Sequence, residues 1–145
     1  MADQRLKILY LCTGNSCRSQ MAEALTNHLR GDQFQAFSAG VNPQGLDPLA
    51  VVAMAEVGID IAGRQSKTPE ALGQTSFDYV VTLCDNARNN CPVLLGPHQN
   101  RHRGFDDPPL LARDAVERDQ ALAPYRRVRD QIRDMVLGLP GSLDD

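Results

Sequence analysis

No stretch of this 145-residue chain approaches the ~18 consecutive apolar residues that a membrane-spanning helix needs. The apolar stretch near the N-terminus is too short for an export signal and contains Lys7. The formal net charge of -3 gives no general attraction to nucleic acid or to anionic membranes, and the chain has no basic recognition element. We therefore expect a cytoplasmic protein with neither a membrane nor a nucleic acid as its partner.

Internal repeats, low-complexity segments and linkers are also missing. A chain of this length fits one domain, residues 1–145, because domains have ~100–200 residues. It is long enough to bury most of its apolar surface without stabilising disulfides or metal ions. Only four cysteines are present, and in the cytoplasm they would be reduced, so no fixed disulfide framework is expected. Cysteines in such a chain indicate redox chemistry, catalysis or a metal.

Strand-like and helix-like patterns alternate along the chain. The sequence predicts strands at 6–11, 34–37 and 79–83, a weaker strand near 102–104, and helices at 19–30, 49–57, 69–72 and 122–136. This alternation is typical of a parallel sheet with helices on both faces. Ligands bind such sheets beyond the carboxyl ends of the strands. Cys12 and Cys84 each follow a strand, so we expect both at one edge of the sheet.

The strongest motif is a cysteine, five residues and an arginine, Cys12 to Arg18, directly after the first strand. A loop of this kind wraps a tetrahedral oxyanion with backbone N–H groups and a helix N-terminus, and its arginine grips two oxygens. The same field stabilises a thiolate at Cys12, which makes that sulfur a nucleophile. The loop residues expected around the anion, besides Arg18, are Thr13, Gly14, Asn15, Ser16, Cys17 and Ser19. Cys17 is expected to be mainly structural.

Residues 12–23, CTGNSCRSQMAE, resemble the thioredoxin-coupled arsenate reductases, which share a fold with the low-molecular-weight protein tyrosine phosphatases. The resemblance extends through the motifs SAG at 38–40, VTLC at 81–84, CP at 91–92, GFDDP at 104–108 and RVRD at 127–130. It implies a three-layer α/β/α fold with a four-stranded parallel sheet, low-molecular-weight phosphatase-like, and a monomer.

The resemblance also implies a three-cysteine relay. Cys12 would attack the arsenic of arsenate, Cys84 would attack the sulfur of Cys12 as arsenite leaves, and Cys91 would attack Cys84. Thioredoxin would reduce the resulting Cys84–Cys91 disulfide, so electrons come from thioredoxin and no tightly bound cofactor is needed. Glutaredoxin or another thiol carrier stays open as the donor. Such a protein would serve arsenic detoxification, with weak phosphatase activity on the side.

Four alternatives stay open at this point. A phosphatase would use Cys12 and a general acid alone, although Pro109-Leu110-Leu111 stand where phosphatases of this fold carry aromatic residues. A zinc site would use the cysteines in C-x4-C and C-x6-C pairs, which depart from the usual short spacings. A non-enzymatic thiol sensor would need a partner-binding surface. Cys84 and Cys91 could also be inert core residues.

Five further expectations concern particular residues and segments. Asp107, before Pro108, matches the general acid of the family, and the adjacent Asp106 is the alternative. Some members hold potassium near Asn15, Glu23 and Ser38, with an acidic residue where Lys67 stands here; we expect the Lys67 ammonium to take the cation's place and pair with Glu23. Residues 110–119 are interpreted as a charged surface insertion, and an Arg126–Asp130 pair is expected on the final helix. The three histidines are assigned no role.

Overall fold

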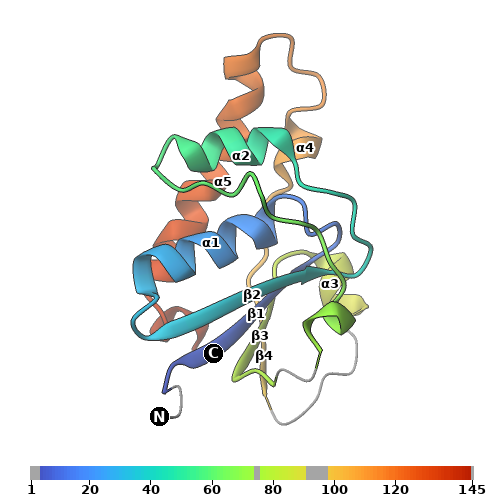
Figure 1. Ribbon diagram of the computed structural model, residues 1–145. Helices are drawn as coiled ribbons and strands as arrows, with labels where there is room; N and C mark the ends of the chain where they lie inside the picture. The colour runs from blue at the N-terminus through green and yellow to red at the C-terminus, as the bar shows by residue number, and fades with distance from the viewer. Residues whose placement is uncertain (1–3, 74–75, 91–97, 145) are drawn as a thin grey trace.

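The computed structural model describes residues 4–73, 76–90 and 98–144. Four parallel strands form one sheet in the order β2-β1-β3-β4 (Figure 1). The strands are β1 (Leu6–Cys12), β2 (Phe34–Gly40), β3 (Tyr79–Thr82) and β4 (Gln99–His102). Because all four run the same way, their carboxyl ends share one edge. The expected α/β class, with a four-stranded parallel sheet, is confirmed.

The helices are α1 (Arg18–Arg30), α2 (Pro48–Ala55), α3 (Asp85–Asn89), α4 (Pro108–Leu111) and α5 (Arg118–Leu137), with 3-10 turns η1 (Pro69–Leu72) and η2 (Gly141–Leu143). None of the helices in the described ranges is long and apolar enough to cross a membrane.

The side chains of β1 show how the sheet separates two cores. Ile8 and Tyr10 pack with residues of α1, α2 and α5 on one face, whereas Leu9 and Leu11 pack with Phe77 and with residues of β3 and α3 on the other. Alternate side chains of a strand point to opposite faces, so β1 is buried on both sides and reads as a continuous apolar run. The three-layer arrangement is visible in Figure 1, with α1, α2 and α5 on one side and α3 on the other.

Two strands differ from the sequence prediction. β2 does not end at residue 37 but continues to Gly40, which is in register with Cys12. A Cβ at Gly40 would lie 2.7 Å from the Thr13 carbonyl oxygen, so glycine is needed where β2 meets the loop after β1. β4 occupies 99–102 rather than 102–104. Its residues are polar because it is an edge strand, so no apolar alternation marked it.

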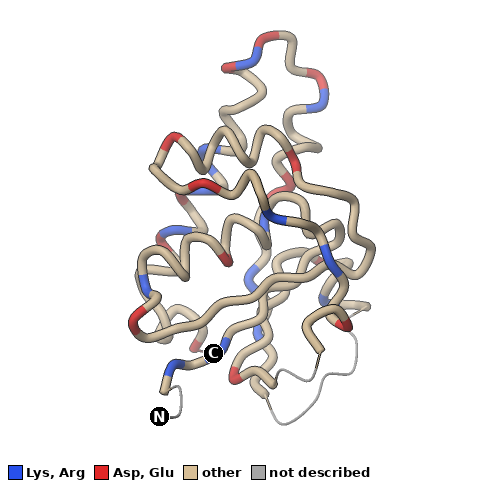
Figure 2. Tube along the Cα trace, viewed as in Figure 1, with Lys and Arg blue, Asp and Glu red and all other residues tan. Residues whose placement is uncertain are grey.

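The predicted insertion at 110–119 is only partly a loop. α4 takes its first two residues and α5 begins at Arg118, and between them lies an exposed connection with Val116 at its surface. Figure 2 shows charges of both signs along this connection at the top of the molecule. The expected Arg126–Asp130 pair is wrong. Arg126 binds Glu56 of the α2 C-cap and Asp119 instead, because the neighbouring helix offers a carboxylate at 2.8 Å.

Candidate active site

A pocket of about 270 Å³ opens at the carboxyl edge of the sheet, where β1 passes into α1. It is lined by Cys12, Thr13, Gly14, Ser16, Cys17, Arg18, Gln44, Asp107 and Pro109. Six of these nine residues belong to the loop that the sequence singled out. Asn15 and Ser19, which were also expected around the anion, are fully buried behind the loop.

The carbonyl groups of the loop are held by the neighbouring segment 41–47. Backbone N–H groups of Val41, Asn42, Gln44 and Asp47 donate to the carbonyl oxygens of Cys12, Thr13, Gly14 and Ser16 at 2.8–3.2 Å. The Asn15 carbonyl accepts from the Ser66 hydroxyl and from Gln20. Asn15 itself has a φ of 49°, a left-handed conformation that asparagine tolerates better than most residues. Every carbonyl from 12 to 16 therefore has a protein donor.

The N–H groups of the loop are left for a ligand. Among the described residues, no protein acceptor binds the backbone N–H groups of positions 14–17. Backbone donors are rarely left without an acceptor, and several of them in a row at a pocket wall form an anion-binding concavity. The N-terminus of the 13-residue helix α1, which begins at Arg18, adds partial positive charge. The pocket is suited to a small oxyanion.

The Cys12 sulfur is held by a hydrogen-bond chain. Its Sγ lies 2.9 Å from the Ser19 Oγ, and that oxygen accepts a 2.7 Å hydrogen bond from the Asn15 side-chain amide. The Asn15 side-chain oxygen accepts in turn from the Lys67 backbone N–H at 3.0 Å. Because Asn15 donates to Ser19, the hydroxyl proton of Ser19 is free to point at the sulfur. The chain therefore presents a hydrogen-bond donor to the Cys12 sulfur.

Arg18 and Asp107 lie together at the mouth of the pocket. Arg18 donates to the Phe105 carbonyl at 2.9 Å, and its other terminal nitrogen lies 3.7 Å from Asp107 Oδ1. Asp106 points elsewhere, toward Arg127 of α5 at 3.1 Å. Of the two adjacent aspartates, only Asp107 lines the pocket, so it is the one placed to exchange a proton there.

Cys84 lies beside the loop, at the end of β3. Its Sγ lies 3.3 Å from the Thr13 hydroxyl and accepts from the Ala87 N–H at 3.4 Å, which makes Cys84 the N-cap of α3. Asn86 of α3 donates to the same Thr13 hydroxyl at 3.0 Å. The fold thus brings Cys84 to the residue that follows Cys12. Cys91 lies outside the described residues.

Cys17 differs from the other two described thiols. All three are free, and Cys12 and Cys17 are both buried, but Cys17 lies near Asp47. Burial, helped by the negative charge of Asp47, raises the pKa of the Cys17 thiol well above its usual value. It therefore stays a neutral thiol at pH 7 and is a poor nucleophile.

The expected Lys67–Glu23 pair is wrong. Lys67 donates its ammonium to the Gln65 carbonyl at 3.3 Å, while the carboxylate of Glu23 binds Arg64 and accepts from the Ser38 hydroxyl. The backbone of Lys67 contacts the site instead: its N–H donates to the Asn15 side chain, and its carbonyl accepts from the Gly40 N–H. Its side chain consequently points away from the buried carboxylate, and the guanidinium of Arg64 supplies the positive charge there.

Two residues near the pocket carry no signal in the sequence. Gln44 lines the pocket opposite the loop, with its side chain against Gly14. Asp47 caps α2 and accepts a 2.5 Å hydrogen bond from the Tyr125 hydroxyl, which ties α5 to the segment that holds Ser16. Neither follows a strand or belongs to a motif, so only the tertiary structure identifies them. Among the described residues, no three metal-ligating side chains come together.

Comparison with known proteins agrees with this geometry. Residues 7–144 match the model of the low molecular weight phosphotyrosine protein phosphatase family, and the chain belongs to that family. Within it, the chain is 48% identical to an arsenate reductase of Bacillus subtilis (strain 168), over 87% of this chain and 89% of the relative.

Two solved structures are also similar. An arsenate reductase from Archaeoglobus fulgidus aligns with a TM-score of 0.72 at 30% identity, over 92% of this chain and 98% of that one. A low molecular weight protein tyrosine phosphatase from T. tengcongensis has a TM-score of 0.71 at 22% identity, over 95% and 99% of the two chains. The second likeness concerns the fold alone. The resemblance found in the motifs is confirmed, together with the low-molecular-weight phosphatase-like fold.

Proposed function

We propose that this protein reduces arsenate to arsenite and that thioredoxin returns it to the reduced state. The observation that carries the proposal is Cys84, a thiol placed 3.3 Å from the Thr13 hydroxyl of the oxyanion loop. A phosphatase needs no second thiol there, whereas a reductase must supply two electrons. Curated relatives at 41–48% identity that carry the name arsenate reductase support the same choice.

The first step forms a bond between Cys12 and arsenic. The loop N–H groups and Arg18 bind the arsenate oxygens, and the Cys12 thiolate attacks arsenic(V). One oxygen leaves as water after it takes a proton, and Asp107 at the mouth of the pocket is the donor. Ser19 supports the thiolate before the attack. No electrons have moved to arsenic at this stage.

The second step reduces arsenic. The Cys84 thiolate attacks the Cys12 sulfur, the sulfur–arsenic bond breaks, and arsenic leaves with the electron pair as arsenite. Cys91 then attacks Cys84 and releases the Cys12 thiolate, which leaves a Cys84–Cys91 disulfide. Thioredoxin supplies two electrons and two protons to restore both thiols. No tightly bound cofactor takes part.

We infer that disulfide formation unwinds α3. Its five helical residues, Asp85–Asn89, span about 7.5 Å, whereas the Cα atoms of a disulfide lie ~4.4–6.8 Å apart. A chain that kept α3 intact would have to double back immediately after Asn90. α3 is five residues long and has one buried residue, Ala87, so its unwinding disturbs little of the core.

The test follows reduction of arsenate with a thioredoxin system, by the consumption of the reducing cofactor. Wild type should turn over, while Cys84→Ser and Cys91→Ser should stop after at most one cycle. Cys17→Ser is the matched control because Cys17 is buried and protonated, and it should keep most of the activity. Steady turnover in Cys84→Ser would refute the relay.

Phosphatase activity is the second candidate function, because the loop selects shape and charge and therefore accepts phosphate as well. Exposed Leu110 and Leu111 stand beside the pocket mouth, where they offer no aromatic ring to a phosphotyrosine. We expect only slow hydrolysis of an aryl phosphate. Fast hydrolysis with inert arsenate would reverse the assignment.

A further inference from the structure

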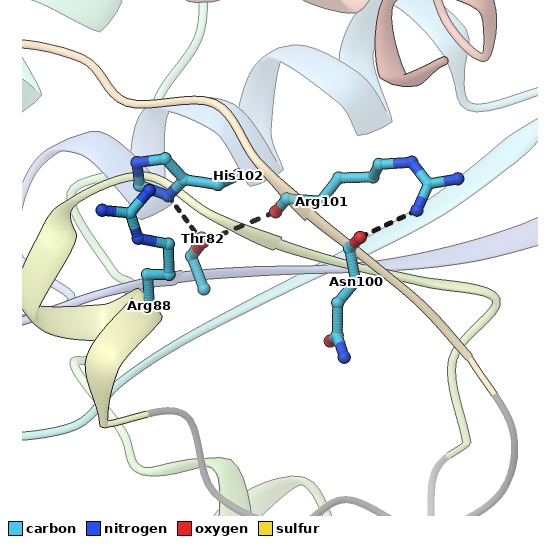
Figure 3. A pocket seen from close by; sticks show the side chains of 5 residues that line it. All are labelled: Thr82, Arg88, Asn100, Arg101 and His102. Atoms are coloured by element: carbon cyan, nitrogen blue, oxygen red, sulfur yellow. Dashed lines mark hydrogen bonds between the residues drawn. The ribbon is translucent and has the colours of Figure 1, made fainter. Parts of the chain in front are cut away.

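His102 connects the two chain segments on either side of Cys84. It lies at the end of β4, and Figure 3 shows its ring between Thr82 and Arg88. The imidazole Nδ1 shares a 2.8 Å hydrogen bond with the hydroxyl of Thr82, two residues before Cys84. The Nε2 lies 3.4 Å from the carboxylate of Asp85, the residue directly after Cys84. One side chain therefore contacts both flanks of the thiol.

The helix that carries these contacts is weakly packed. Ala87 is its single buried residue. Beside it lies a hollow of about 290 Å³ lined by Thr82, Arg88, Asn100, Arg101 and His102 (Figure 3). With so little apolar area buried, polar contacts supply much of what holds α3 in place. Two polar contacts join the start of α3 to other parts of the chain: Asp85 contacts His102, and Asn86 donates to Thr13.

Three charged residues lie near the His102 imidazole: Asp85, Arg88 and Arg101. Asp85 is shared, since Arg88 also lies 3.3 Å from the same carboxylate oxygen. Arg101 turns its guanidinium away, to the Leu143 carbonyl at 2.7 Å. His102 is anchored in strand β4, and its imidazole contacts Thr82 and Asp85.

We propose that His102 is a positioning residue that holds the Cys84 segment in its reduced, helical form and thereby shifts the redox equilibrium of the Cys84–Cys91 pair toward the thiols. The proposal rests on the relay described above, in which α3 unwinds on oxidation. Unwinding moves Asp85 away from His102, so the contact stabilises the reduced form only. Its loss favours the disulfide.

The first experiment measures the thiol–disulfide equilibrium of the whole protein against a dithiol buffer. His102→Ala should shift the equilibrium constant toward the disulfide about two- to fivefold, the effect of one exposed ion-pair contact, which corresponds to about 10–20 mV. His102→Asn retains a polar group near Thr82 but loses the reach to Asp85, so it should shift the equilibrium as far as His102→Ala does. His28→Ala, an exposed histidine on α1, is the matched control and should behave as wild type. An unchanged equilibrium in a folded His102→Ala protein would overturn the proposal.

The second experiment separates this inference from the relay itself. If wild type forms no Cys84–Cys91 disulfide, the relay fails, and the holding role is read from hydrogen exchange in the reduced protein. The N–H groups of Ala87, Arg88 and Asn90, which are bonded within the α3 turn, should exchange about two- to fivefold faster in His102→Ala. The N–H of Leu83, bonded to the Leu11 carbonyl, should not change. Equal exchange at α3 in both proteins contradicts the proposal.

Discussion

Ser19→Ala tests the hydrogen-bond chain behind Cys12. The substitution removes the 2.9 Å contact to the sulfur and leaves the Asn15 side-chain amide without its acceptor. A hydrogen bond to a charged group contributes about 1.5–3 kcal/mol, and 1.36 kcal/mol is tenfold in rate. Alkylation of Cys12 at a fixed pH should therefore slow, by up to roughly 10- to 100-fold.

The assay is alkylation of the reduced protein by iodoacetamide at pH 7, with the modified cysteine identified by peptide mass spectrometry. Ser16→Ala is the matched control, because Ser16 belongs to the same loop but has no hydrogen bond to the Cys12 sulfur. Its rate should stay within about twofold of wild type. If Ser19→Ala and wild type alkylate Cys12 equally fast, the Ser19 hydroxyl does not stabilise the thiolate and the inferred chain is wrong.

Three more outcomes are expected. Arg64→Met should lower the free energy of unfolding by about 2 kcal/mol in a denaturant titration. The loss is smaller than for a fully buried pair, because the Arg64 side chain is 36% exposed while that of Glu23 is 8% exposed. Adding Glu23→Gln should recover much of the loss, and full stability in Arg64→Met would contradict the pairing. Asp107→Asn should lower kcat with arsenate about 10²- to 10⁴-fold while phosphate still binds; a loss below about threefold would remove Asp107 as proton donor. Burial raises the pKa of Tyr10 and of Cys17, so their contribution to stability is complete below the unfolded pKa values of 10.0 and 9.0 and is lost as pH rises from those values toward the raised folded values. Tyr10→Phe should therefore flatten the fall in unfolding free energy above about pH 10, and an unaltered slope there would refute that origin.

The sequence predicts which site residues directly follow a strand. It does not predict which residues from distant segments contact them. Cys12 and Cys84 reach one edge because parallel strands end together, and the spacing to Arg18 is local. Arg64 could not be predicted, because its contact with Glu23 depends on how segment 64–67 folds across α1. The same holds for His102, whose strand is polar and whose partners lie 17 and 20 residues away in the chain.

The segment 41–47 gives the oxyanion loop a property that the loop lacks by itself. Its four N–H groups bind the loop carbonyls, and because these bonds lie within the protein itself, the cradle is shaped during folding. Arsenate or phosphate would then meet a preorganised site, and little conformational entropy would remain to be lost on binding. Part of the affinity for the anion therefore depends on segment 41–47, which lies outside the motif and lines the pocket only through Gln44.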